Sequence, residues 1–207
     1  MIRSQHRVVR AWRLAFLSVT SIIAFIASPA RAQREVAYDD GTPERTMVWN
    51  EAGNGLAVRF SVERGSILLG ARFCTGWSPF WNPLGICVLD ANGPGGAPGD
   101  TLLSYYVEPL DARLGWQGVA FRVPLPIASG EFYIVYLQTG SSNGDATPLA
   151  LDTSNPGPGR SWIFESHVWS PLAPTSGNVM IRAILSSEVP VVPVTWSGIK
   201  AQYRVPR

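Results

Sequence analysis

Hydrophobic and polar side chains alternate along much of this chain. Residues 58–62 (Val, Arg, Phe, Ser, Val) and 119–123 (Val, Ala, Phe, Arg, Val) are apolar at every second position. This period predicts strands that each turn one face to a core. Phe132–Leu137 is apolar on both faces, as expected of a central strand. Further strand-like runs cover residues 66–75, 85–90 and 179–185.

Turn-forming residues separate these runs. Clusters rich in Gly, Pro, Asn, Asp and Ser occupy residues 53–55, 92–100, 141–145 and 155–159. Their spacing predicts about nine or ten short strands. The runs between them lack the apolar spacing and caps of a helix. Because two sheets can bury each other's apolar faces, we predict an all-β fold with a single antiparallel β-sandwich over residues 33–185.

The first 32 residues have the pattern of a signal peptide. Four arginines precede an uncharged apolar run, Leu14–Ala27, and Ala30-Arg31-Ala32 follows as a small-x-small cleavage site. The run is shorter than the about 20 residues that a membrane span needs. We therefore predict cleavage after Ala32, no membrane span in the mature chain, and a secreted, periplasmic or cell-surface location in a bacterial envelope.

Removal of this leader changes the charge balance. The whole chain has 17 basic and 15 acidic side chains; the leader holds five arginines and no acid, so the mature chain has 12 basic groups and a net charge of −3. A nucleic-acid partner is not expected, because such a protein needs a basic face. With 46% hydrophobic and 15% charged residues, the chain is expected to fold around a packed core.

The C-terminal residues differ in texture from the predicted sandwich. Residues 186–194 are a Pro-punctuated linker, and residues 195–207 form a short tail. Thr195 is a candidate cap for a short helix that would place Trp196, Ile199 and Tyr203 on one face. A helix of this length is not stable alone. We predict that the tail docks on a partner or acts in sorting.

Two cysteines remain in the mature chain, Cys74 and Cys87. If the runs 66–75 and 85–90 pair as a hairpin, residues whose numbers sum to 161 face each other, and these two do. An exported protein meets an oxidising environment, so we predict a cross-strand disulfide. The alternative is two buried free thiols.

Candidate catalytic residues are few. His167 is the single histidine of the mature chain, and the sequence has no Gly-x-Ser-x-Gly or His-Glu-x-x-His motif. We interpret His167 as a surface or strand-edge residue and predict that the protein is not an enzyme. A pair of carboxylates could still hydrolyse a glycoside, which makes a glycoside hydrolase the third alternative for function.

No cofactor is expected, with calcium as the one candidate ion. Asp90, Asn92 and Asp100 flank a Gly/Pro-rich loop, and calcium accepts carboxylate, amide and backbone oxygens. Asp39 and Asp40 offer similar oxygens at the start of the domain. The alternative is that all of these side chains make ordinary Asx-turns with their own backbone.

Aromatic residues provide the strongest surface signal. Trp77, Phe80 and Trp81 cluster in the loop between the two cysteines. They either cap the core or form a contact surface for a glycan or a cell-surface protein. Three other tryptophans lie in strand-like runs and are predicted to be core residues: Trp49, Trp116 and Trp162.

Three segments carry a resemblance to a known type of domain. They are Tyr38-Asp39-Asp40-Gly41-Thr42-Pro43-Glu44, the run 152–162, and Asn178-Val179-Met180-Ile181-Arg182-Ala183. Together they resemble the jelly-roll-like accessory modules of secreted and cell-surface bacterial proteins, over residues 36–185. Such modules accompany exported peptidases and type IX secretion cargo. In that family the module is usually an appendage. The sandwich pattern, the missing catalytic motifs and the aromatic loop favour a non-catalytic extracellular binding or adhesion module; the alternative is a structural or interaction subunit of an envelope assembly.

Overall fold

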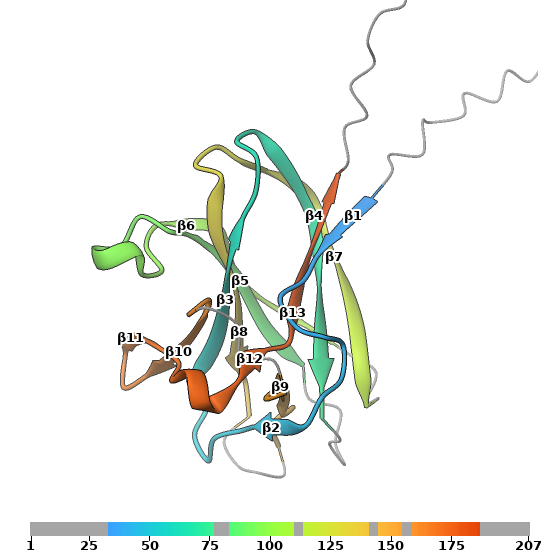
Figure 1. The fold of residues 1–207 in the computed structure, drawn as a ribbon, viewed down its shortest axis with the longest axis vertical. Helices are drawn as coiled ribbons and strands as arrows, with labels where there is room; N and C mark the ends of the chain where they lie inside the picture. Colours follow the sequence, from blue (N-terminus) through green and yellow to red (C-terminus); the bar gives the residue numbers. More distant parts are fainter. Residues whose placement is uncertain (1–32, 77–82, 110–113, 141–144, 155–158, 187–207) are drawn as a thin grey trace, which may run out of the picture. The chain divides into compact units, whose positions relative to one another are not determined.

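A computed structural model of the chain describes residues 33–76, 83–109, 114–140, 145–154 and 159–186. These residues form thirteen strands in two antiparallel sheets (Figure 1). The predicted leader, most of the linker and the tail with Trp196, Ile199 and Tyr203 lie outside the described residues, as does the aromatic loop with Trp77, Phe80 and Trp81. No helix in the described ranges is long and apolar enough to cross a membrane.

The first sheet has seven strands. Its main path is β1 (Gln33–Val36), β13 (Ile181–Ser186), β4 (Ser66–Thr75), β9 (Leu149–Asp152) and β12 (Asn178–Val179). β2 (Arg45–Met47) pairs with β9, and β7 (Gly115–Ile127) pairs with β4. A short 3₁₀ turn, η2 (Pro174–Ser176), precedes β12.

The second sheet has six strands. Their order is β11 (Val168–Pro171), β10 (Ser161–Glu165), β3 (Gly55–Ser61), β8 (Glu131–Gln138), β5 (Leu84–Asp90) and β6 (Thr101–Glu108). A 3₁₀ turn, η1 (Pro94–Gly96), lies in the loop between β5 and β6. The predicted β-sandwich is confirmed. Several strands have only two to four residues, too few to show an alternation of their own, and so the turn spacing predicts fewer strands than form.

The core lies between the two sheets and follows the predicted alternation. Val58 and Phe60 of β3 are buried, and the Phe60 and Phe132 rings stack with centroids 5.4 Å apart. β8 lies between β3 and β5, which confirms the central strand predicted for residues 132–137. Its inward and outward side chains are both covered: Ile134 joins the main core, whereas Val135 packs in a second cluster on the outer face.

One predicted core position is exposed. Val119 and Phe121 of β7 are buried as expected, but the Val123 side chain is 70% exposed. The cause is a register shift, because β4 residues 68 and 70 pair with β7 residues 125 and 120. The extra residues of β7 bulge out of the ladder and end the alternation there.

The predicted pairing of the two cysteine-bearing strands is wrong. β4 and β5 belong to different sheets, and both cysteines are free and buried. Phe73 and Ile86, which precede them, lie in the main core, so each cysteine points to the outer face of its own sheet. Cys74 therefore packs against Met180, and Cys87 against Tyr133, on opposite sides of the sandwich. A disulfide cannot span that separation.

Candidate binding site

Gln138, at the end of β8, holds the loop that leads into β3. The residue is 2% exposed. Its Oε1 accepts a hydrogen bond from the Trp49 N–H at 2.8 Å, and its Nε2 donates to the carbonyls of Trp49 and Glu51 at 2.7 and 3.1 Å. Its backbone also bonds to Gly53 and Asn54. One buried amide side chain thus fixes the loop 49–54, a role that the sequence analysis missed.

The turn between β10 and β11 faces this loop. Glu165 pairs with Val168, so Ser166 and His167 form a two-residue hairpin turn. Both have positive φ values, 51° and 64°. Two-residue turns with positive φ favour Asn-Gly, because Gly has no Cβ and Asn tolerates the left-handed region better than most other residues. The His167 ring packs edge-on against Phe164 at 6.2 Å, and the residue is exposed, as the sequence predicts.

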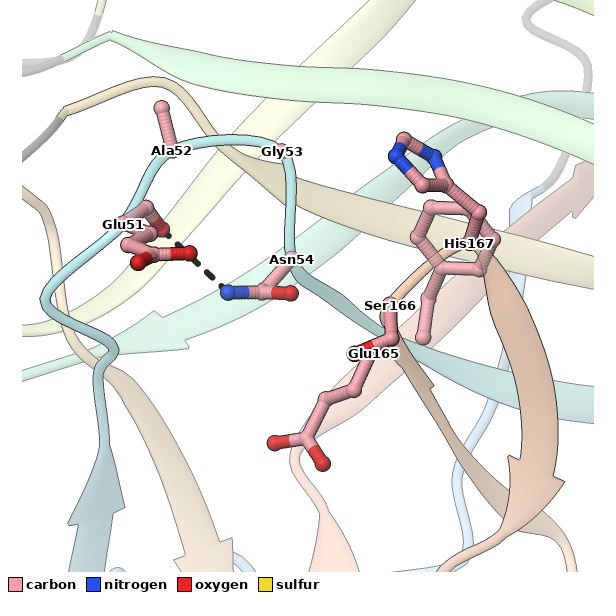
Figure 2. Close-up of a pocket in the computed structure, with 8 residues that line it drawn as sticks. Glu51, Ala52, Gly53, Asn54, Glu165, Ser166 and His167 are labelled. Atoms are coloured by element: carbon pink, nitrogen blue, oxygen red, sulfur yellow. Dashed lines mark hydrogen bonds between the residues drawn. The ribbon is translucent and has the colours of Figure 1, made fainter.

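A pocket of about 270 Å³ lies between the loop and the turn. Figure 2 shows Glu51, Gly53 and Asn54 on one side of it and Glu165 and His167 on the other. The Asn54 amide donates to the backbone carbonyl of Glu51 at 3.4 Å, and Glu51 and Glu165 both line the pocket. The Trp49 Nε1–H donates to Glu165 at 2.5 Å and fixes that carboxylate. The pocket thus offers carboxylate and amide groups that can bond to ligand hydroxyls.

An aromatic row continues from the pocket along the outer face of the six-stranded sheet. It consists of Trp162, Phe164 and Trp169, all partly exposed. Phe164 and Trp169 are cross-strand partners with ring centroids 4.9 Å apart, and Trp162 packs edge-on against Tyr133 at 5.8 Å. The intervening Ile163 faces the core. Trp162, predicted to be a core residue, is half-buried against the second cluster on the outer face, because its strand turns that side chain away from the space between the sheets.

The other two tryptophans that the sequence predicts as core residues, Trp49 and Trp116, differ in their surroundings. Trp49 packs against the main core, as predicted. Trp116 lies on the outer face of the seven-stranded sheet, beside Cys74. The guanidinium groups of Arg182 and Arg72 lie over its ring at 4.1 and 5.4 Å. Trp116 therefore forms part of a cation–π stack rather than of the main core.

The loop proposed for calcium is closed by its own hydrogen bonds. The Asn92 amide donates to the Asp100 carboxylate at 2.7 Å, and the Asp100 N–H donates to Asn92 Oδ1 at 2.9 Å. Asp90 instead accepts a bond from the Ala91 N–H. The structure brings Asn92 and Asp100 together, in the arrangement of the Asx-turn alternative. Calcium binding there stays a prediction. The same loop covers the outer face of the sheet, where Tyr133 Oη donates to the Gly96 carbonyl at 2.5 Å.

The segments that carry the resemblance meet in the structure. Arg182 forms an ion pair with Asp39, with 2.5 Å between Nη2 and Oδ1. The side-chain amide of Asn178 donates a hydrogen bond to the backbone carbonyl of Tyr38 at 3.1 Å. Asp152, fully buried, accepts hydrogen bonds from the Asp40 N–H and from Ser154. We call this junction the clasp. It joins the loop after β1 to β9 and β13.

The clasp contains a group of carboxylates. Within the described part of the chain, Asp40, Glu44 and Asp152 have oxygens that all lie within 4.8 Å of one another. Such oxygens are the ligands that a hard divalent cation prefers. Each of the three also accepts hydrogen bonds: Thr42 N–H binds Asp40, and Thr153 N–H binds Glu44. These protein donors account for the positions of the carboxylates without a cation.

The fold is that of an all-β sandwich domain, with a polar pocket and an aromatic row on the outer face of one sheet. No protein-family model matches the chain. The chain is 31% identical over 183 residues to Bacillopeptidase F of Bacillus subtilis strain 168; the match covers 85% of this chain and 12% of that protein. The chain therefore corresponds to a small part of the length of this peptidase.

Two solved structures share the fold. The clostridial cysteine protease Cwp84 after propeptide cleavage superimposes with a TM-score of 0.58 at 16% identity, over 74% of this chain and 40% of that chain. The cysteine protease and lectin-like domains of Cwp84, a surface layer associated protein of Clostridium difficile, give a TM-score of 0.50 at 17% identity, over 65% and 32%. Bacillopeptidase F and Cwp84 are both peptidases by name, which fits the resemblance to modules that accompany peptidases.

Proposed function

We propose that the chain is a non-catalytic extracellular module that binds a glycan on the outer face of its six-stranded sheet. The observation that carries this proposal is the aromatic row, which is partly exposed and leads into the pocket between Glu51 and His167. Sugar rings have apolar C–H faces that pack on aromatic rings, and hydroxyl groups that bond to carboxylates and amides. The row and the pocket supply both kinds of contact.

Two further observations support the proposal. One of the structures with this fold is described as containing a lectin-like domain. The predicted leader and the surface-layer description of Cwp84 support a location outside the cytoplasm. The jelly-roll-like accessory modules that the sequence resembles serve as appendages of exported peptidases, and we extend that role to this chain. The aromatic loop with Trp77, Phe80 and Trp81 lies outside the described residues, and a role for it in ligand contact stays a separate prediction.

A glycan array probed with residues 33–207 tests the proposal. We expect binding that Trp162→Ala weakens by about tenfold, equal to about 1.4 kcal/mol. The matched control is Trp116→Ala, which removes the same side chain from the outer face of the other sheet. Melting curves of both variants show whether each remains folded. If no glycan binds, or if both variants bind equally weakly while still folded, the proposal is wrong.

A further inference from the structure

A second pocket lies at the other end of the same pair of strands. It has a volume of about 200 Å³ and is lined by Arg59, Ser61, Glu131, Gly159 and Arg160. β10 and β3 pair from Phe164 with Gly55 to Ser161 with Val58. Phe164 lines the first pocket, and its partner Gly55 is four residues along β3 from Arg59, or roughly 13 Å at about 3.3 Å per residue. The aromatic row lies between the two pockets, so one oligosaccharide could reach both.

Arg160 is held in place by groups that carry no negative charge. Its guanidinium lies over the Tyr38 ring at 4.1 Å. Its Nη1 donates to the Arg59 carbonyl at 3.3 Å and to the Ser61 hydroxyl at 3.1 Å. A guanidinium has five N–H donors in a fixed fork. Within the described residues, Nη2 and Nε of Arg160 form no hydrogen bond. These N–H groups therefore remain available to a ligand, on a guanidinium whose position is already fixed.

The one carboxylate of this pocket is already paired. Glu131 binds Arg59 at 2.5 Å and also accepts a bond from Ser61 Oγ at 3.3 Å. The hydrogen bond from Arg59 lowers the pKa of Glu131, so this group is ionised at neutral pH. Glu131 and Arg59 balance each other in charge. The charge of Arg160 is left over, and the pocket as a whole carries a net positive charge.

We infer that this pocket binds a carboxylate of the glycan, which makes the ligand an acidic oligosaccharide such as a uronic-acid polymer. This inference rests on the proposed function and adds the chemical class of the ligand. A planar guanidinium matches the two oxygens of a carboxylate. The ring of Tyr38 and the two acceptors hold the fork in one orientation, so little conformational entropy is lost on binding. Neutral sugar units would pack on the aromatic row, and an acidic unit would lie at Arg160.

The experiment compares acids with their own neutral forms. A glycan array carries oligogalacturonate, oligoalginate and hyaluronan oligomers, each beside its carboxyl methyl ester, together with neutral polysaccharide fragments and an acidic peptide. Residues 33–207 are tested as the native sequence and as three variants. Arg160→Gln removes the charge; Arg160→Lys keeps the charge but loses the fork. Arg122→Gln is the control, because it removes one exposed arginine from β7 in the other sheet.

We expect at least one free acid to bind about tenfold or more tightly than its ester. Arg160→Gln should abolish that preference, Arg160→Lys should lose most of it, and Arg122→Gln should retain it. If neutral glycans bind and no acid is preferred, the inference is overturned while the proposed function stands. A preference that survives in Arg160→Gln overturns the assignment to this pocket. If only the acidic peptide binds, or no probe binds, both the inference and the proposed function fail.

Discussion

Replacing Gln138 by Met should loosen the loop that forms one side of the first pocket. The Met side chain has similar length but cannot form the three side-chain bonds that Gln138 makes with Trp49 and Glu51. Each such bond contributes about 0.5–1.5 kcal/mol, and a backbone group left unpaired costs about 1–3 kcal/mol. Because Trp49 is only half-buried, water can reach part of the gap. We expect the free energy of unfolding to fall by about 3 kcal/mol.

Urea unfolding followed by tryptophan fluorescence measures this loss. For a domain of this size, 3 kcal/mol corresponds to a fall in melting temperature of roughly 6–12 °C. Gln138→Glu keeps the acceptor for the Trp49 N–H, but it loses the bonds donated to the carbonyls of Trp49, Glu51 and Gly140. It also places a carboxylate at a buried position, so it should destabilise the fold at least as much as Gln138→Met. Gln33→Met makes the same chemical change at an exposed position of β1 and should alter stability by less than about 0.5 kcal/mol. A loss below about 1 kcal/mol for Gln138→Met would refute the role assigned to this amide.

Three further outcomes follow from the same structure. The double change Ser166→Asn with His167→Gly places residues that favour positive φ in the turn. It should raise the free energy of unfolding by about 1 kcal/mol and weaken glycan binding. Urea unfolding and the glycan array measure the two effects on one preparation. Burial raises the pKa of the Cys87 thiol to about 12 and also raises the pKa of Cys74, so the native protein should resist thiol reagents at pH 7.5. The intact mass should not change on reduction. A gain of about two daltons on reduction would show a disulfide instead. The lowered pKa of Glu131 stabilises the fold above the unfolded pKa of this group, and the stabilisation is lost as the pH falls through the folded value. Glu131→Gln should therefore be less stable than the native sequence at pH 7, and urea titrations should show this difference shrink as the pH is lowered below the ordinary pKa of a glutamate.

The sequence predicts the fold class well because burial by alternation is a local property. Each of Val58, Phe60 and Val119 follows from its neighbours, and their faces are as expected. Strand pairing depends on distant residues, and here the sequence misleads. The numbers of Cys74 and Cys87 fit a hairpin that does not form, because the strands that bear them join different sheets.

The candidate site shows the same limit. Gln138 gives one local signal, since it is a polar residue at the end of a wholly apolar run. Its partner Trp49 lies 89 positions away, and nothing in the sequence connects the two. Trp162 is hard to orient for another reason. Three consecutive residues of its strand, Trp162 to Phe164, are apolar, so the period of two does not say which face is inside.

The placement of the clasp separates what holds this domain together from what we propose it binds. The segments that carry the resemblance supply the buried Asp152 and the ion pair between Arg182 and Asp39, which join β1, β9 and β13. The first pocket instead uses the two-residue turn and residues 51–54 of the loop, and none of these residues belongs to the main core cluster. Turn and loop residues can change without disturbing the sheets. Domains that share this clasp can therefore have one scaffold and different ligands. Likeness to part of a peptidase supports the fold, whereas our proposal for the ligand rests on the outer-face residues around Trp162 and Arg160.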